Sequence, residues 1–186
     1  MCFNISVNTS RQKNISRAGE GRCCGTLGTV FHSLGKFVKA REYSEKALAI
    51  TMENEDKVGE ATCYGNLGSV FQSYGEYVKA RKYYEKALAI SMEIGHKEGK
   101  ATECRSLGTV FSSIGEYVKA KEYYEKALAI NMEIGDRANE GSWYGNLGNV
   151  FQSLGEYRKA KEYYEKALAI SMKIGDRAGE GTCIET

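Results

Sequence analysis

The stretch Tyr64-Gly65-Asn66-Leu67-Gly68-Ser69-Val70-Phe71 decides the fold, because it returns every 40 residues along the chain. A nearly intact copy begins at Tyr144, an altered copy at Cys104 and a diverged copy at Cys24. A fixed period of about 20 to 50 residues is typical of a solenoid, in which each repeat buries its apolar face against its neighbours. We therefore expect function on a repeated surface rather than in a single pocket.

The period divides the 186 residues into four repeats, which we number 1 to 4 and place at 21–60, 61–100, 101–140 and 141–180. Residues 1–20 are interpreted as the remnant of a preceding repeat or as a disordered leader. Residues 181–186 are interpreted as the start of a truncated fifth repeat.

The residue pattern within each repeat predicts a first helix, a short turn and a longer second helix. In repeat 2 the apolar residues from Cys63 to Tyr74 follow helical spacing, Gly75 interrupts them, and a second apolar run reaches Ile94. Because the chain has no proline, glycine is expected to set the helix boundaries. The expected turn glycines are Gly35, Gly75, Gly115 and Gly155 within repeats, and Gly95, Gly135 and Gly175 between them. At the first junction Asn54 and Glu55 replace the Ile-Gly pair, which predicts a frayed or differently angled step.

Composition excludes several classes of function. The 26 basic and 24 acidic residues give a net charge of +2 without a long run of one sign, which favours neither nucleic acid nor a membrane surface as partner. No stretch approaches the roughly 18 apolar residues of a membrane span, and the N-terminus lacks a secretory signal, so a cytoplasmic protein is expected. The six cysteines, without a C-x-x-C pair, predict free and partly buried thiols, no metal site and no cofactor.

Seven positions of repeat 2 connect the chain with a known family. Its Tyr, Leu, Gly, Phe, Ala, Tyr and Ala residues follow the spacing of the tetratricopeptide repeat (TPR), at Tyr64, Leu67, Gly68, Phe71, Ala80, Tyr84 and Ala87. The 40-residue version resembles the LGN-family adaptors, the kinesin light chains and large multi-repeat scaffolds of animals. The resemblance implies an all-α fold, an α-α superhelix whose concave face is lined by the first helix of each repeat. Repeat 1 departs from the pattern, because Ser44 stands where the others have tyrosine, and we expect it to pack least well.

The first helices of repeats 2 and 4 carry no charge from Ala61 to Gly75 and from Gly141 to Gly155, whereas the second helices are densely charged. A merely solvated helix face ordinarily carries charged side chains. The uncharged polar positions therefore predict a peptide-binding groove. The expected groove residues are Thr62, Asn66, Ser69, Gln72, Ser73, Arg105, Ser106, Thr109, Ser142, Asn146, Asn149 and Gln152.

Amide side chains both donate and accept hydrogen bonds, so a row of Asn and Gln can hold the main chain of an extended peptide. Asn66 and Asn146 resemble the asparagine ladder with which relatives hold such peptides, although Thr26 and Ser106 interrupt it here. Arg105 is the groove residue best suited to bind a carboxylate, which favours a ligand with acidic residues. Gly65 and Gly145 lie inside helices, either to let a ligand approach or to avoid a clash with the preceding repeat.

These features predict a non-catalytic scaffold that binds an extended peptide or protein segment. The alternative is a structural spacer, or a segment of a larger multi-repeat protein that self-associates through uncapped ends. An enzyme fits poorly, because no nucleophile has a visible base and no phosphate-binding glycine loop is present. The tyrosine pairs of the second helices, such as Tyr83-Tyr84, are interpreted as packing residues rather than as stacking platforms for nucleic-acid bases.

Overall fold

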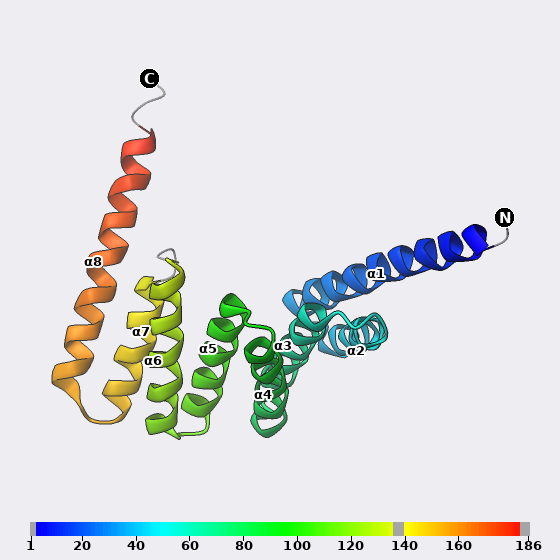
Figure 1. Ribbon diagram of the computed structural model, residues 1–186. Helices are drawn as coiled ribbons and strands as arrows, with labels where there is room; N and C mark the ends of the chain where they lie inside the picture. The colour runs from blue at the N-terminus through cyan, green and yellow to red at the C-terminus, as the bar shows by residue number, and fades with distance from the viewer. Residues whose placement is uncertain (1–2, 136–139, 183–186) are drawn as a thin grey trace. The chain divides into compact units, whose positions relative to one another are not determined.

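The computed structural model describes the backbone of residues 3–135 and 140–182, and the side chains of residues 17–135 and 140–173. The described residues form helices joined by short turns and contain no strand, so the predicted all-α architecture is confirmed (Figure 1). Residues 1–99 and 100–186 form two compact units, here called the N-terminal and C-terminal halves. Each half is described by itself.

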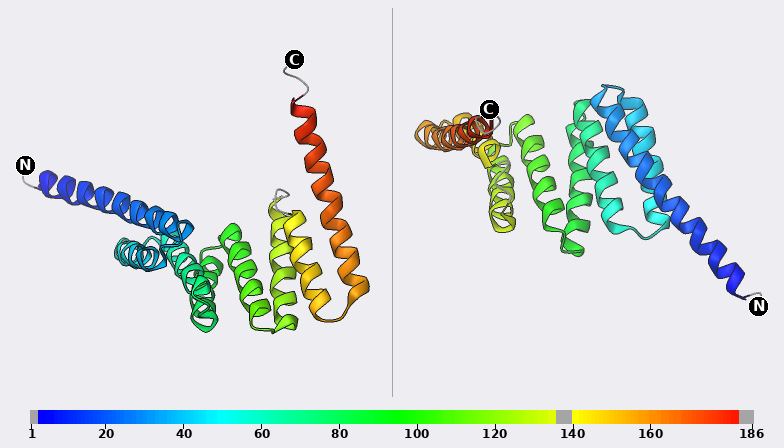
Figure 2. Two further views of the ribbon diagram at one scale, coloured as in Figure 1. Left: turned by 180° about the vertical axis from the view of Figure 1, so that it is seen from behind. Right: turned by 90° about the horizontal axis from the view of Figure 1, so that it is seen from above.

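The N-terminal half contains α1 (Phe3–Ser33), α2 (Phe37–Glu53), α3 (Lys57–Ser73) and α4 (Tyr77–Glu93). Helix α5 (Lys97–Ser113) begins just before the boundary and is followed in the C-terminal half by α6 (Tyr117–Ile134), α7 (Glu140–Ser153) and α8 (Tyr157–Thr182). Consecutive helices pack as pairs, α1 with α2, α3 with α4, and α7 with α8, as the further views also show (Figure 2). The odd-numbered helices are thus the first helices of the repeats.

Small residues let the two helices of a repeat approach closely. A Cβ atom built on Gly68 would lie 2.6 Å from the Tyr84 ring, and one on Gly108 would lie 2.8 Å from the Tyr124 ring. Both tyrosines are buried, with exposed fractions of 3% and 5%. In repeat 1 the buried Ser44 replaces this ring, and its hydroxyl has no hydrogen-bond partner. Repeat 1 therefore lacks the tyrosine contact of the other repeats, and the weaker packing expected of it stays a prediction.

The first tyrosine of each pair packs at the edge of its repeat. Tyr83 stacks on Phe71 with ring centroids 5.2 Å apart, and Lys86 lies 5.7 Å from the Tyr83 centroid. The same stacking joins Phe111 with Tyr123 and Phe151 with Tyr163. Such contacts stabilise each repeat by about 0.5 to 1.5 kcal/mol beyond burial. The interpretation of these tyrosines as packing residues is confirmed.

Glycine sets the turns at the predicted places, with one exception. Positive φ angles occur at six of the seven expected positions, Gly35, Gly75, Gly95, Gly115, Gly135 and Gly155. At Gly175 the prediction is wrong, because α8 continues through this residue to Thr182. No described segment after Gly175 folds back onto α8, and continued helix formation keeps the backbone hydrogen bonds satisfied.

At the first junction a frayed or differently angled step was expected, and the fraying is not found. Glu55 adopts a φ of 56°, the left-handed conformation that Gly95 adopts at the next junction. The hydrogen bonds agree as well, since Asp56 N donates to Thr51 O at 2.9 Å and His96 N donates to Ser91 O at 2.9 Å. The turn therefore forms without glycine, because its backbone hydrogen bonds and the following helix cap hold it.

Replacing Glu55 with glycine is expected to raise the free energy of unfolding by about 1 kcal/mol. A non-glycine residue in the left-handed region costs about 1 to 2 kcal/mol, part of which glycine loses again through its greater freedom in the unfolded chain. Thermal unfolding followed by circular dichroism measures the effect, and Glu42→Gly is the control. Glu42 is exposed in the interior of helix α2, where glycine should destabilise the protein. Equal destabilisation by both substitutions would contradict the account of this turn.

Candidate peptide-binding groove

Five of the predicted groove residues hold the tyrosine hydroxyls of the second helices. The Tyr84 hydroxyl donates to Gln72 Oε1 at 2.9 Å and lies 3.1 Å from Ser69 Oγ. The Tyr124 hydroxyl donates to Thr109 Oγ1 at 3.0 Å. In repeat 4 the Tyr164 hydroxyl lies close to both amide oxygens, 2.7 Å from Asn149 Oδ1 and 2.8 Å from Gln152 Oε1. These residues therefore join the two helices of a repeat, a role that the sequence analysis did not assign to them.

Three further hydroxyl-bearing candidates are also bonded within the protein. Thr62 Oγ1 donates to Val58 O at 2.9 Å and Ser106 Oγ donates to Thr102 O at 3.0 Å, each one turn back along its own helix. Ser73 Oγ lies 2.9 Å from His32 Nε2 and so links α3 with α1. Each hydroxyl keeps acceptor lone pairs for a ligand, but its donor is engaged where it donates to a carbonyl.

Asn66 on α3 and Asn146 on α7 differ from the other candidates. Both side chains are half-buried on their first helices, and neither has a hydrogen-bond partner among the residues that the structure describes. Each amide therefore offers its carbonyl oxygen and its NH2 group to a ligand. Ser142, one turn before Asn146, is exposed.

A cavity of about 580 Å³ lies in the N-terminal half, lined by the first helices α1 and α3 and by the C-terminal end of α2. Thr62 and Asn66 are the two predicted groove residues that line it. Its apolar lining comes from Ile50 of α2 and from Val58 and Cys63 of α3, and Gly21 and Gly25 line it on α1. A concave, mostly apolar cavity with a few polar groups is the usual form of a ligand site.

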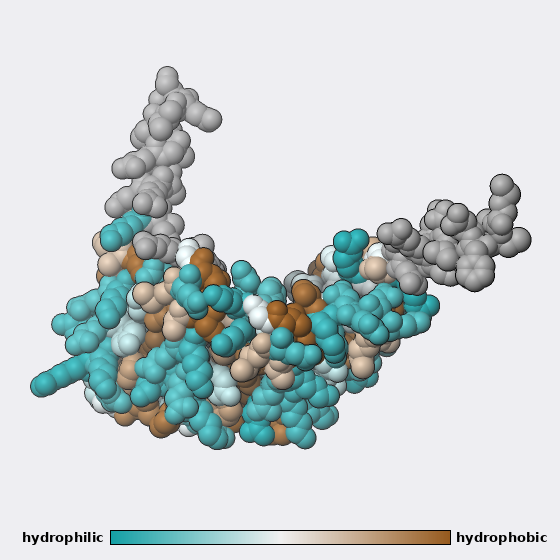
Figure 3. Space-filling view, in the orientation of Figure 1, coloured by the Kyte–Doolittle hydropathy of each residue, from teal (hydrophilic) through white to brown (hydrophobic). Residues whose placement is uncertain are grey.

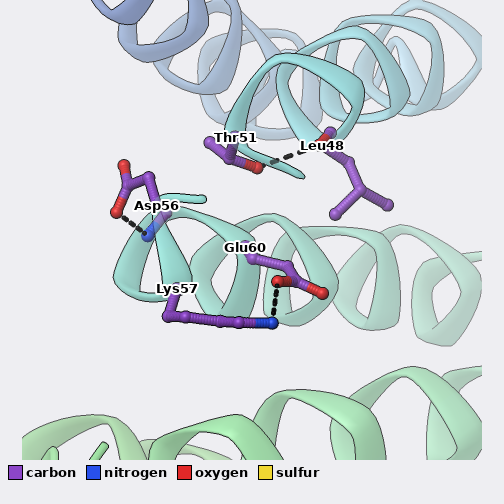
Figure 4. A network of polar contacts seen from close by, with 6 residues as sticks. Leu48, Thr51, Asp56, Lys57 and Glu60 are labelled. Carbon is purple, nitrogen blue, oxygen red and sulfur yellow. Dashed lines mark hydrogen bonds and ion pairs between the residues drawn. The ribbon is translucent and has the colours of Figure 1, made fainter. Parts of the chain in front are cut away.

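Polar contacts fix the junction that forms one side of this cavity (Figure 4). Asp56 caps α3, since Gly59 N donates to its Oδ1 at 2.9 Å, and Thr51 Oγ1 donates to Leu48 O at 3.0 Å. Lys57 Nζ donates to the buried Glu60 carboxylate at 2.9 Å, which holds the pKa of Lys57 above its usual value. Asp56 and Thr51 are thus held in place where they line the cavity.

Arg105 occupies a different environment in the C-terminal half. Its guanidinium carbon lies 5.6 Å from the centre of the Trp143 ring, so that the planar group on α5 covers an indole on α7. Trp143 is buried, with an exposed fraction of 6%, whereas Arg105 is exposed. The ring attracts the cation electrostatically, and the guanidinium keeps N–H groups for a carboxylate. The sequence analysis selected Arg105 but missed Trp143, the single tryptophan of the chain.

Glycine inside a first helix was expected either to let a ligand approach or to avoid a clash with the preceding repeat. The space around Gly145 distinguishes between these two explanations. A Cβ atom built on Gly145 would meet nothing within 4 Å, so no neighbouring residue requires glycine there. Gly141 on the same helix would come within 3.5 Å of Ala167 O, which is ordinary contact. A clash with a neighbouring residue therefore does not explain the glycine at Gly145.

Replacing Gly145 with alanine is expected to stabilise the protein by about 0.5 to 1 kcal/mol, since alanine is the better helix former and the space is open. A melting experiment on the free protein checks this value. Affinity for a groove ligand should fall in the same variant, because the added methyl group projects into the open space. Lower stability of the free protein would show that glycine serves the fold at this position.

Burial raises the pKa of several titratable groups on the first helices, and by a large amount for Cys63 and Glu103. Burial raises the pKa of the Cys63 thiol to about 11, so this cavity-lining residue is a neutral thiol at physiological pH. Burial also raises the pKa of Glu103 to about 8, against the opposing charge of Arg105. Cys23, Cys24, Cys63 and Cys104 are free thiols, as predicted, whereas the side chains of Cys2 and Cys183 lie outside the described residues.

Within the residues that the structure describes, no group of three or more His, Cys, Asp or Glu side chains lies close enough to hold a metal ion. Over the same part of the chain, no helix is long and apolar enough to cross a membrane.

The helix pairs and the left-handed glycine turns define a helical-repeat protein. The family profile described as tetratricopeptide repeat matches residues 23–93 and 101–173, which is more than half of the chain. The chain therefore belongs to the tetratricopeptide repeat family. Proteins of this family are generally non-catalytic interaction modules. No curated protein sequence matches the chain.

Solved structures of the same fold include BtubC (BKLC) from P. vanneervenii, with 25% sequence identity and a TM-score of 0.76 over 83% of this chain and 64% of that chain. A Rap protein complexed with Competence and Sporulation Factor has 19% identity and a TM-score of 0.78, over 86% and 45%. A kinesin light chain-like repeat protein from Podosopora anserina has 18% identity and a TM-score of 0.68, over 84% and 76%. The chain spans less than two thirds of the first two proteins.

Proposed function

We propose that this protein is a non-catalytic scaffold that binds an extended peptide segment of a partner protein along its first helices. The unpartnered amides of Asn66 and Asn146 carry this proposal. An amide that no group of the protein engages can exchange its bound water for hydrogen bonds with a ligand. An extended peptide offers a main-chain carbonyl and a main-chain N–H in every residue, so one amide can pair with both whatever the ligand sequence.

Two other observations support a ligand along the first helices. The first helices of repeats 2 and 4 carry no charge over the stretches given above, whereas the exteriors of the second helices α4 and α6 are largely hydrophilic (Figure 3). Ligand binding by a protein of this fold has a precedent in the Rap protein solved with Competence and Sporulation Factor. Open space at Gly145 would let a peptide backbone approach the helix.

Arg105 indicates which type of residue the ligand contains. Held over the Trp143 ring, its guanidinium can pair with a carboxylate through two parallel N–H donors. We therefore expect ligands to carry an acidic residue or a C-terminal carboxylate that contacts the C-terminal half. Arg105→Lys keeps the charge but loses the fork and the planar stacking, so it should weaken acidic peptides while leaving neutral peptides unaffected.

A peptide library displayed on phage, selected against the purified protein, tests the proposal. The Asn66→Ala, Asn146→Ala double variant serves for comparison, since neither amide bonds to a described residue and the fold should be unchanged. Loss of two amide contacts at about 1 kcal/mol each should lower affinity at least tenfold. Selected peptides that bind the double variant with unchanged affinity would contradict the role of the two asparagines.

Self-association is the second candidate function, and apolar exposure at both ends of the array favours it. Leu27 and Val30 in repeat 1 are 40% and 47% exposed, whereas Leu67 and Val70, at the same positions of repeat 2, are each 1% exposed. Tyr164 is 36% exposed, compared with 5% for Tyr124. Light scattering over a range of concentrations would detect stacking of one end on another. A constant monomer mass would contradict this candidate.

A further inference from the structure

Two equivalent positions differ sharply between the halves of the chain. In the N-terminal half, Gly25 of α1 and Cys63 of α3 both line the 580 Å³ cavity. Eighty residues further on, the same repeat positions hold Arg105 of α5 and Trp143 of α7, and there the guanidinium covers the indole ring at 5.6 Å. Where the C-terminal half has the large side chains of Arg105 and Trp143, the N-terminal half has only the hydrogen atom of Gly25 and the small thiol side chain of Cys63. The space that Arg105 and Trp143 fill in one half is open in the other.

We propose that this cavity, here called the Gly25 pocket, accepts a large apolar side chain of the bound peptide, with an acidic residue beside it in the peptide sequence. This proposal rests on the proposed function and adds the chemistry that one part of the groove selects. Leu, Met and Phe are the expected anchors, because each can fill the space above the α2 end.

The lining of the pocket favours an apolar anchor. Ile50 and Cys63 are 9% and 4% exposed and present a hydrocarbon side chain and a neutral thiol. Val58 is 50% exposed, so that half of its surface remains to be covered. A charged anchor would lose its hydration against these residues without an opposite charge on them, whereas an apolar anchor removes apolar surface from water.

The charged residues of the pocket lining determine which type of peptide residue is favoured next to the apolar anchor. Arg22 and Asp56 are the two charged residues that line the pocket. Asp56 is engaged by Gly59 N as the cap of α3, and Arg22 is exposed on α1. Arg22 therefore provides a positive charge for an acidic residue of the ligand. Thr62 and Asn66 lie in the same lining and can bind the peptide main chain.

The protein itself supplies the substitutions that close the pocket. Gly25→Arg combined with Cys63→Trp transfers the residue pair of the C-terminal half to the same positions of the N-terminal half. A Cβ atom on Gly25 meets only Ala47 Cβ, at an ordinary 3.9 Å, so the backbone tolerates a side chain there. The single variant Gly25→Arg avoids any change in the buried Cys63. Ala49→Arg, on the exposed face of α2, adds the same charge away from the pocket and is the control.

Displayed peptides are selected on the wild-type protein and then titrated against the wild type and each variant, including Arg22→Gln, after circular dichroism has shown that each is folded. We expect peptides with a Leu, Met or Phe next to Asp or Glu, bound at least tenfold more weakly by Gly25→Arg and by the double variant. Ala49→Arg should bind them as the wild type does. Arg22→Gln should weaken acidic peptides and spare versions with Asn or Gln in place of the acid.

A second arm keeps this test independent of any selected peptide. N-acetyl-leucine methylamide is added to the methyl-labelled protein, and the signals of Ile50 and Val58 are followed by NMR. Saturable shifts of both signals that disappear in Gly25→Arg are expected, with N-acetyl-aspartate methylamide as the charged comparison.

The outcomes separate this inference from the proposed function. Selected peptides without an apolar position, or equally strong binding to the closed variants, would overturn the pocket while the groove remains. A failure to select any peptide would contradict the proposed function. The NMR titration with N-acetyl-leucine methylamide would then still test the pocket, and unchanged methyl signals of Ile50 and Val58 would overturn the pocket proposal.

Discussion

Replacing Glu103 with glutamine is expected to make the protein more stable above neutral pH and to remove a large part of the pH dependence of its unfolding. The side chain is 7% exposed and its Oε2 atom has no hydrogen-bond partner. Burial raises the pKa of Glu103 to about 8 in the folded protein, compared with 4.5 for an ordinary glutamate. The folded state therefore binds this proton more tightly than the unfolded state does.

The direction of the effect follows from that difference. The stabilising contribution of the protonated carboxyl is complete below about pH 4.5 and is lost as the pH rises through 8. Since one pKa unit corresponds to 1.36 kcal/mol, Glu103 should lower the free energy of unfolding by about 3 kcal/mol between pH 5 and pH 8. Glutamine keeps the shape and carries no charge, so its variant should not show this loss.

Chemical unfolding of both proteins at pH 5 and pH 8 measures the difference. Glu98→Gln is the control, because it makes the same substitution at an exposed position of the same helix. Parallel pH profiles of the wild type and Glu103→Gln would show that the Glu103 carboxylate reaches water in the folded protein.

Replacing Gly108 with alanine is expected to destabilise the protein by about 2 kcal/mol, as overpacking of a well-packed core usually costs about 1 to 3 kcal/mol. The new Cβ atom would lie 2.8 Å, 2.9 Å and 3.0 Å from Cδ1, Cε1 and Cγ of Tyr124. Ring rotation cannot relieve the contact, because Cγ lies on the rotation axis. The hydrogen bond from the Tyr124 hydroxyl to Thr109 further holds the ring.

Gly145→Ala is the matched comparison, since it makes the same substitution in another first helix with nothing within 4 Å. Thermal unfolding should therefore give shifts of opposite sign, a lower melting temperature for Gly108→Ala and a higher one for Gly145→Ala. Shifts of the same sign in both variants would contradict the assignment of the two glycines.

The sequence predicted the fold well because the determinants of the fold recur in every repeat. Four copies of the Leu-Gly pattern and of the turn glycines made the helix pairs and the family recognisable. The error at Gly175 arose because glycine permits a left-handed turn without requiring one, and α8 continues through this residue. The error at Glu55 arose because backbone hydrogen bonds can stabilise a left-handed residue without glycine.

The site was less predictable. Pattern analysis identified polar positions on the first helices but not the direction of their hydrogen bonds, so Ser69 and Asn149 were not recognised as partners of tyrosine hydroxyls. The Gly25 pocket depends on the absence of side chains, which a search for chemically active residues does not detect. The sequence did contain an indication of the pocket, because Gly25 occupies the repeat position at which repeat 3 has Arg105.

The most direct test of the peptide-binding account is an NMR titration of the side-chain amides with a peptide selected on the protein. The account predicts that the NH2 signals of Asn66 and Asn146 shift in a saturable way as they acquire hydrogen bonds to the peptide main chain, while the amide signal of Asn131, which already bonds to Ala127 O at 2.9 Å, stays in place. Peptide binding that leaves both groove asparagine signals unchanged would contradict it.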